Sequence, residues 1–208
     1  MLDTGSLTIR RVSVSEMDNN CYLLTCRVTG EQLLVDAADA PDTLLSLVHE
    51  GSPTGRLDTV VTTHQHRDHH RALRAVVEAT GARTVAGDED ADALPVPVDV
   101  RVGHGDTVSV GDVTLDVVHL RGHTPGSVAL VHRGADGSTH VFTGDSLFPG
   151  GVGNTEGDPT RFTSLLDDVE RRLFDELPDD AVVHPGHGPS TTIGAERPHL
   201  GEWRERGW

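Results

Sequence analysis

One short stretch of this chain is so rich in histidine that it limits the possible folds more than any other feature. Four groups that can bind a metal ion stand within six residues, directly after an apolar segment that predicts a buried strand: His64, His66, Asp68 and His69. In extended backbone, residues two apart point the same way, so His64 and His66 can reach one ion. We expect the chain then to turn into a helix over 69–80, which moves Asp68 and His69 to a neighbouring position. Imidazole and carboxylate suit zinc and similar ions, and the stretch therefore predicts a metal centre at a strand end.

Three further segments place histidine or aspartate directly after a predicted strand. His123 lies in Arg-Gly-His-Thr-Pro-Gly, Asp145 in Thr-Gly-Asp-Ser, and His187 in His-Pro-Gly-His-Gly. The glycine and proline neighbours allow sharp turns and a close approach of backbone to a buried ion. Loops at strand ends often carry functional sites, so we expect these three side chains to join the first four.

The remaining pattern predicts many strands and few helices. Strands are expected over 7–14, 21–28, 32–38, 58–63, 84–86, 98–102, 107–110, 113–120, 127–132, 139–143 and 181–183, and helices over 41–50, 69–80, 159–174 and within the tail. A doubly wound parallel sheet would need a helix between most strands. The pattern instead favours two packed sheets with helices outside.

Charge and length exclude several classes of function. The 17 basic residues are all arginine, against 33 aspartate and glutamate residues, which gives a net charge of −16. Such a surface repels nucleic acid and anionic membranes, and the lack of lysine excludes a Schiff base or a phosphate-binding lysine loop. The 208 residues suit one domain with a short tail at 193–208. No run reaches the roughly 18–20 apolar residues of a membrane span, and the N-terminus has no signal-peptide pattern, so we expect a cytoplasmic protein.

The two cysteines, Cys21 and Cys26, lie in one predicted strand. Their odd spacing puts them on opposite faces of that strand, so we expect no disulfide bond between them.

The order of the seven candidate ligands resembles the metallo-β-lactamase superfamily. The resemblance extends from Asn20-Cys21-Tyr22-Leu23-Leu24 and Leu34-Val35-Asp36 to His187. It implies an α/β fold, a four-layer αββα sandwich, with a dinuclear site at the edge of two sheets. Carried over residue by residue, it implies that His64, His66 and His123 hold one divalent ion, that Asp68, His69 and His187 hold a second, and that Asp145 bridges them.

The resemblance also distinguishes among the other polar residues near these motifs. It implies that Asp36 supports the ligands from behind, and its spacing favours His69 over His70. His184 is expected to lie beside the site or at the surface without binding an ion. The remaining histidines are expected to be ordinary surface or strand residues; they are His49, His104, His119, His132, His140 and His199.

The implied activity is that of a metal-dependent hydrolase acting on a small molecule. A hydroxide bridging two ions, zinc or alternatively iron, would attack a thioester or ester carbonyl, and Asp68 would orient the hydroxide and carry its proton. The sequences 123–126 and 144–148 most resemble the glyoxalase II branch, which hydrolyses thioesters of glutathione. That branch has a basic residue where Asn154 stands here, and a C-terminal helical domain where only about 20 residues follow His187. We therefore expect weak use of glutathione thioesters, unless Arg197, Arg204 and Arg206 of the tail fold over the site.

Three alternatives remain open at this point. A persulfide dioxygenase would use one iron held by the residues matching His64, His123 and Asp145. A lactonase would hydrolyse cyclic esters at the same two-metal site. A metal-binding protein without catalysis would use the same ligands and no substrate.

Overall fold

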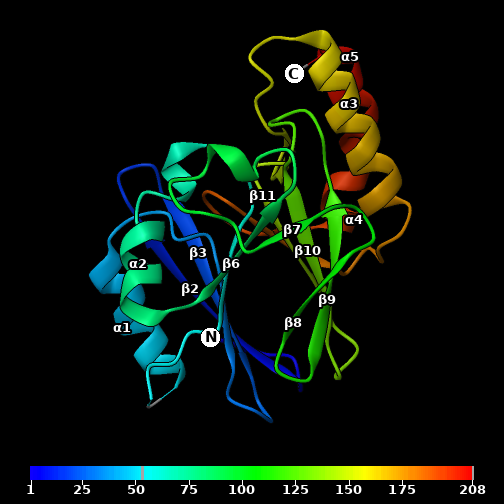
Figure 1. The fold of residues 1–208 in the computed structure, drawn as a ribbon. Coiled ribbons are helices and arrows are strands. Elements are labelled where there is room, and N and C mark those ends of the chain that lie inside the picture. Colours follow the sequence, from blue (N-terminus) through cyan, green and yellow to red (C-terminus); the bar gives the residue numbers. More distant parts are fainter. Residues whose placement is uncertain (53, 208) are drawn as a thin grey trace.

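Two β-sheets pack face to face at the centre of the structure, and helices cover their outer faces (Figure 1). The computed structural model describes residues 1–52 and 54–207. One apolar cluster lies between the sheets, and a further cluster lies between each sheet and its helices. The layers therefore run helix, sheet, sheet, helix, and the four-layer α/β sandwich predicted from the sequence is confirmed.

The first sheet follows the chain order. It is antiparallel from β1 to β4 and parallel from β4 to β7. Parallel neighbours need a crossover connection, and α1 (Pro41–Gly51) and α2 (Leu73–Thr80) provide two of these on the outer face. The strands are β1 (Leu2–Asp3), β2 (Leu7–Val14), β3 (Asn19–Cys26), β4 (Gln32–Val35), β5 (Thr59–Thr62), β6 (Arg83–Gly87) and β7 (Val100–Val102).

The second sheet has the strand order β15-β14-β11-β10-β9-β8. Only the β11–β14 pair is parallel, and α3 (Pro159–Val169) lies in the connection between these two strands. The strands are β8 (Thr107–Val110), β9 (Val113–His119), β10 (Val128–Arg133), β11 (Thr139–Gly144), β14 (Val182–Pro185) and β15 (Thr191–Thr192); a separate small hairpin pairs β12 (Leu147–Phe148) with β13 (Gly151–Val152).

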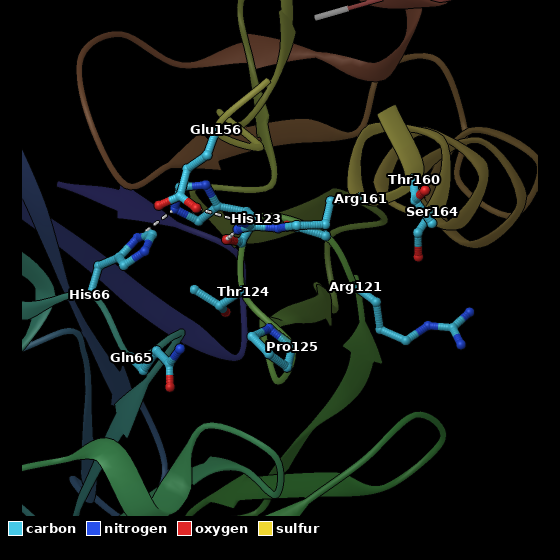
Figure 2. A pocket seen from close by; sticks show the side chains of 11 residues that line it. Gln65, His66, Arg121, His123, Thr124, Pro125, Glu156, Thr160, Arg161 and Ser164 are labelled. Carbon is cyan, nitrogen blue, oxygen red and sulfur yellow. Dashed lines mark hydrogen bonds and ion pairs between the residues drawn. The ribbon is translucent and has the colours of Figure 1, made fainter. Parts of the chain in front are cut away.

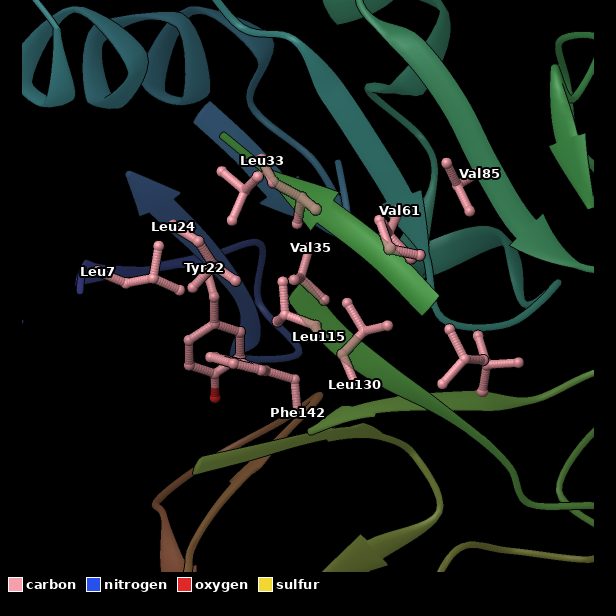
Figure 3. Packing of buried hydrophobic residues seen from close by; sticks show 14 of the residues in the cluster. Leu7, Tyr22, Leu24, Leu33, Val35, Val61, Val85, Leu115, Leu130 and Phe142 are labelled. Carbon is pink, nitrogen blue, oxygen red and sulfur yellow. The ribbon is translucent and has the colours of Figure 1, made fainter. Parts of the chain in front are cut away.

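The core between the sheets explains the alternating pattern of the strands that face it. Leu7 and Ile9 of β2 point inward, as do Leu115 of β9 and Leu130 of β10, while their neighbours along each strand point outward. Phe142 of β11 packs edge-on against Tyr22 of β3, with ring centroids 5.2 Å apart (Figure 3). These contacts fix how far apart the two sheets lie.

The C-terminal residues pack against the second sheet's helical layer. After α3 the chain makes a π-helical turn, η3 (Glu170–Phe174), and the tail forms α4 (Ile193–Glu196), η4 (Arg197–His199) and α5 (Leu200–Arg206). The buried Trp203 of α5 meets Phe174 edge-on, with ring centroids 6.2 Å apart. Within residues 1–52 and 54–207, no helix is long and apolar enough to cross a membrane.

The helix expected over 69–80 begins later than the sequence pattern indicates. The chain first makes a single 3₁₀ turn, η1 (Arg67–His69), and α2 starts at Leu73. The intervening backbone is drawn to the loop after β4, because Arg71 N donates to Ala38 O and Ala72 N donates to Ala37 O. The predicted helix was therefore wrong over its first turn.

Other boundaries differ by a few residues or involve very short elements. The helix expected over 159–174 is α-helical only to Val169, and the two-residue strands β1, β12, β13 and β15 are too short to give a periodic signal. Another 3₁₀ turn, η2 (Ala91–Ala93), was also not expected. The two cysteines lie on opposite faces of β3, as predicted: Cys21 packs toward the helices and Cys26 toward the other sheet.

Candidate metal centre

Seven side chains from the ends of four strands meet at one edge of the sandwich. The segment after β5 contributes four of them, while β9, β11 and β14 each lead into a loop that contributes one. The first sheet thus supplies His64, His66, Asp68 and His69, and the second supplies His123, Asp145 and His187.

The seven side chains form three overlapping groups. Within each group one nitrogen or oxygen atom per residue lies within 4.8 Å of the others, and the groups are His64–His66–His123, His64–His69–Asp145 and Asp68–His69–His187. The structure therefore brings together every residue that the sequence selected as a ligand.

Asp145 lies between the outer groups. Its Oδ1 is 3.3 Å from His69 Nε2, and its Oδ2 is 3.6 Å from His123 Nε2 and 3.4 Å from His187 Nε2. Burial would raise the pKa of Asp145, but the imidazoles of His187 and His69 lower it well below its usual range. An ionised carboxylate at this position can contact cations on both sides of it.

The arrangement of donor atoms fits divalent metal ions. His66 Nδ1 lies 2.8 Å from His123 Nε2, and His69 Nε2 lies 3.1 Å from His187 Nε2, so lone pairs converge on common points. Among the described residues, the buried atoms His64 Nε2 and Asp145 Oδ1 have no hydrogen-bond partner. Unpartnered buried polar atoms are costly, and a cation bound by nitrogen and oxygen would satisfy them.

Hydrogen bonds on the outer ring nitrogens orient four of the histidines. His123 Nδ1 lies 2.7 Å from Asn154 O, and His187 Nδ1 lies 2.7 Å from Met17 O. Each carbonyl can only accept, so each Nδ1 donates and the lone pair of Nε2 faces inward. His64 Nδ1 lies 3.0 Å from Thr63 Oγ1, and His69 Nδ1 lies 2.8 Å from Asp36 Oδ2.

Asp36 lies behind His64 and His69 and orients both of them. Its side chain is buried and its backbone has a left-handed φ of 59° just after β4. The carboxylate accepts hydrogen bonds from Thr63 N at 2.7 Å and Thr63 Oγ1 at 2.8 Å, besides its contact with His69. Asp36 therefore orients His69 directly and His64 through the Thr63 hydroxyl.

Asp68 is held by a residue that sequence reasoning missed. Asn19, fully buried at the start of β3, donates from Nδ2 to Asp68 Oδ2 at 3.0 Å, and its own Oδ1 accepts from Ser15 Oγ at 2.6 Å. Burial would raise the pKa of Asp68, but the bond from Asn19 and the imidazole of His69 outweigh it and lower that pKa. No local signal marks Asn19, because its role depends on the distant segment that it faces.

At Gly186 the backbone passes so close to the donor residues that a side chain has no room. Gly186 lies so close to the site that a Cβ there would collide with Asp145 Oδ1 and with the ring of His69. This close approach explains the Pro-Gly-His sequence, since the loop must pass the buried carboxylate before it presents His187.

The histidines outside the groups have other roles. His70 Nε2 lies 3.0 Å from Gln65 O, and His70 belongs to none of the three groups within the described chain. His184 is buried, with Nε2 3.0 Å from His140 Nδ1 and the two rings stacked. His132 and His140 are strand residues and are buried, not at the surface. Each lies two residues from Leu130 or Phe142 and therefore shares the face that points between the sheets.

A pocket of about 530 Å³ opens beside the centre (Figure 2). His66 and His123 line one end of it, and Gln65, Glu156, the 121–125 loop and α3 provide the other lining residues. The tail does not bring all of its arginines to this region: Arg197 pairs with Asp179, and Arg204 pairs with Asp167 and Glu170. Arg206 donates to Gly150 O at 3.1 Å.

Comparison with known proteins agrees with this geometry. A hydroxyacylglutathione hydrolase of Fuscovulum blasticum is 35% identical over 171 residues, covering 82% of this chain and 62% of that enzyme. The chain thus spans about three fifths of the length of such relatives.

Two solved structures are similar over most of their length. The structure of ETHE1 from Myxococcus xanthus has a TM-score of 0.80 and 30% identity, covering 95% of this chain and 85% of that one. TTHA1623 in a di-iron-bound form has a TM-score of 0.74 and 31% identity, covering 90% and 96%. The family model of the metallo-beta-lactamase superfamily matches residues 14–187. Because this match covers most of the sequence, the chain belongs to the metallo-beta-lactamase superfamily.

Proposed function

We propose that this protein is a metal-dependent hydrolase of thioesters or esters with two divalent ions, zinc or iron. His64, His66 and His123 would hold one ion, Asp68, His69 and His187 the other, and Asp145 would contact both. The observation that carries the proposal is the position of Asp145 between the two outer groups of donor atoms. Bound there, the ions would supply a water activated near neutral pH and an electrophile for the acyl oxygen.

Asp68 is the group that would handle protons. Its carboxylate is ionised, and one oxygen is fixed by Asn19 at 3.0 Å and lies 3.2 Å from His187 Nε2. A carboxylate held in this way can accept a proton from the attacking water and return it to the leaving group. The side chain is 17% exposed, so it can also exchange protons with solvent.

The similarity to hydroxyacylglutathione hydrolases supports thioester hydrolysis, but the surroundings of the site favour another thiol or alcohol. The side chain of Asn154 is uncharged, and its Oδ1 accepts from Glu156 N at 2.8 Å. Each of the three tail arginines pairs with a carboxylate: Arg197 with Asp179, Arg204 with Asp167 and Glu170, and Arg206 with Glu202. Desolvating a carboxylate without a cationic partner is costly, so the glutathione carboxylate that a basic residue would bind at position 154 loses that contact here. We propose that residues 1–208 form one domain with a short tail at 193–208.

A second candidate is a dioxygenase with a single iron. His64, His123 and Asp145 together offer two histidines and one carboxylate, the set typical of non-haem iron oxygenases. His123 Nε2 and Asp145 Oδ2 are 3.6 Å apart, and the rings of His64 and His123 have centroids 4.8 Å apart. The other four donor groups would then have no ligand role, which is why we favour the hydrolase.

One preparation tests both candidates. Protein purified without chelators is analysed for metal. It is then assayed for hydrolysis of S-lactoylglutathione, a neutral thioester and a lactone, and for oxygen uptake with a persulfide. We expect about two ions per chain, hydrolysis of a thioester or ester, and a lower kcat/KM for the glutathione substrate. Asp68→Asn should reduce turnover while the ion held by His64, His66 and His123 stays bound. One iron per chain with persulfide-dependent oxygen uptake would establish the second candidate, and a fully loaded protein that hydrolyses none of the substrates would refute the first.

A further inference from the structure

The pocket beside the metal centre has a charged end away from the ligands. His66 and His123 lie at one end, and Arg121, Thr160 and Ser164 lie at the other, as Figure 2 shows. A substrate whose carbonyl reacts beside the ligands would therefore extend one arm toward Arg121.

Arg121 is held in place by Asp168. Its Nε donates to Asp168 Oδ2 at 2.8 Å and its Nη2 to Asp168 Oδ1 at 2.9 Å, while its backbone N donates to Oδ2 at 3.1 Å. Within residues 1–52 and 54–207, its Nη1 makes no hydrogen bond, and half of the side chain is exposed, at 50%. A guanidinium fixed in this way loses little conformational entropy when it binds a second anion.

The charges around Asp168 leave a positive excess. Arg172 Nη2 also lies 3.4 Å from Asp168 Oδ1, so two guanidinium groups share one carboxylate. That carboxylate stays ionised, because hydrogen bonds from Arg121 lower its pKa against the effect of burial. Arg121, Arg172 and Asp168 together carry a charge of +1 in a chain whose net charge is −16, and Glu89 is a further carboxylate that acts on Arg121.

The other arginine of the pocket is already engaged. Arg161 pairs with Glu156 at 2.6 Å, and it donates to Gly122 O at 2.8 Å and to His123 O at 2.6 Å. Its role is to hold the loop that carries His123. Arg121 Nη1 is thus a charged donor of the pocket with no hydrogen bond among the described residues, and Thr160 and Ser164 line the same end.

We propose that Arg121 binds a carboxylate carried on one arm of the substrate, so that the enzyme selects thioesters or esters with an anionic arm. This inference rests on the proposed hydrolase function of the neighbouring centre. The carboxylate would accept a charge-assisted hydrogen bond from Nη1, and such bonds are about twice as strong as neutral ones. Arg121 is a specificity residue in this scheme and takes no part in the bond-breaking step.

Two matched substrate pairs test the proposal. In one, S-acetyl-3-mercaptopropionate is compared with its methyl ester, which places the charge on the thiol arm. In the other, the succinyl thioester of N-acetylcysteamine is compared with its methyl ester, which places the charge on the acyl arm. We expect the wild type to have a higher kcat/KM for the free acid in at least one pair, and Arg121→Gln to lower that acid-to-ester ratio by roughly 10- to 100-fold through KM.

The variants separate specificity from folding. In Arg121→Gln, Asp168 keeps Arg172 and the backbone donor of residue 121, so no carboxylate is left alone. Arg121→Lys keeps the charge but not the planar guanidinium. It should keep part of the wild type's preference for the acid over its methyl ester. Arg101→Gln is the control: Arg101 pairs with Asp88 and Asp92 and belongs to neither the pocket lining nor the donor groups, so the ratio and the activity should stay unchanged. An equal acid-to-ester ratio in the wild type and Arg121→Gln for both pairs would overturn the proposal.

A binding measurement keeps the two proposals distinguishable. Thioether analogues, in which a methylene group replaces the acyl carbonyl of each pair, cannot be hydrolysed. Calorimetric titration should show tighter binding of the acid than of its methyl ester to the wild type, and no such difference in Arg121→Gln. If no substrate is hydrolysed but the analogues show this difference, the hydrolase function is wrong and the anion site stands. If hydrolysis occurs and the analogues show no difference, the anion site is wrong.

Discussion

Replacing His132 by leucine should remove part of the protein's instability in acid. His132 lies in β10 with no exposed surface, and its Nε2 is 2.9 Å from Thr4 Oγ1. Its Nδ1 has no hydrogen-bond partner among the described residues. A proton added to this ring would create a buried charge beside the stacked ring of His140, whose centroid is 6.4 Å away.

The size of the effect follows from the pKa of His132 in the two states. Burial, aided by His140, lowers the pKa from 6.5 to about 4 in the folded protein. Between these values the unfolded chain binds a proton that the native state does not, so the free energy of unfolding falls as the pH falls. Between about pH 8 and about pH 5, His132 alone should lower the free energy of unfolding by roughly 2 kcal/mol. Leucine has no such dependence; it loses only the hydrogen bond to Thr4, about 1 kcal/mol at every pH.

Urea unfolding at several pH values measures this difference. The protein is kept metal-free with a chelator throughout, because metal binding to histidine itself depends on pH. Between about pH 8 and about pH 5, the free energy of unfolding should fall by roughly 2 kcal/mol more in the wild type than in His132→Leu. His199→Leu, at an exposed position with a side chain 52% accessible, is the matched control and should follow the wild type. Parallel curves for the wild type and His132→Leu would refute the reasoning.

Four further outcomes follow from the site. Asp145→Ala should lose more metal than His187→Ala, because it would remove a ligand from both ions; equal and small losses in elemental analysis would contradict the shared role. Asp36→Asn should weaken metal affinity by roughly 10- to 100-fold in a competition titration, since the amide keeps one acceptor oxygen where Thr63 and His69 now use two, and unchanged affinity would count against this. Asn19→Ala should lower kcat by roughly 10-fold at unchanged metal content, because Asp68 would lose its donor; a change in metal content alone would point to a structural role. Gly186→Ala should prevent metal loading through the collision with Asp145, which elemental analysis with circular dichroism as a folding control would detect, and normal loading would show that the loop can move.

Most strands, and the residues that meet in the three donor groups, could be predicted from local patterns or from the resemblance. The alternation in 7–14 and 107–110 reproduces β2 and β8 to the residue, since one face of each strand meets the core and the other does not. The spacing of His64 and His66 likewise depends only on extended backbone. Asp36, His69 and their neighbours follow from a resemblance that covers most of the sequence.

Features that depend on tertiary contacts could not be predicted. The late start of α2 results from backbone hydrogen bonds to Ala37 and Ala38, which lie about thirty residues earlier in the chain. The role of Asn19 results from its position opposite Asp68. The burial of His132 and His140 requires knowing that the second sheet turns that face toward the first.

The two sheets are joined at the edge where the seven donor groups meet. Asn20 N of β3 donates to Gly186 O at 2.7 Å, and Val128 N of β10 donates to Thr63 O at 2.9 Å. Tyr22 adds a bond from its hydroxyl to Pro185 O, also at 2.7 Å. Because each proposed ion would take ligands from both sheets, these bonds set the separation that brings His123 to His66 and His187 to His69. The chemistry of the site therefore depends on how the whole sandwich packs, and a substitution that shifts one sheet against the other should impair metal binding even when every ligand is intact.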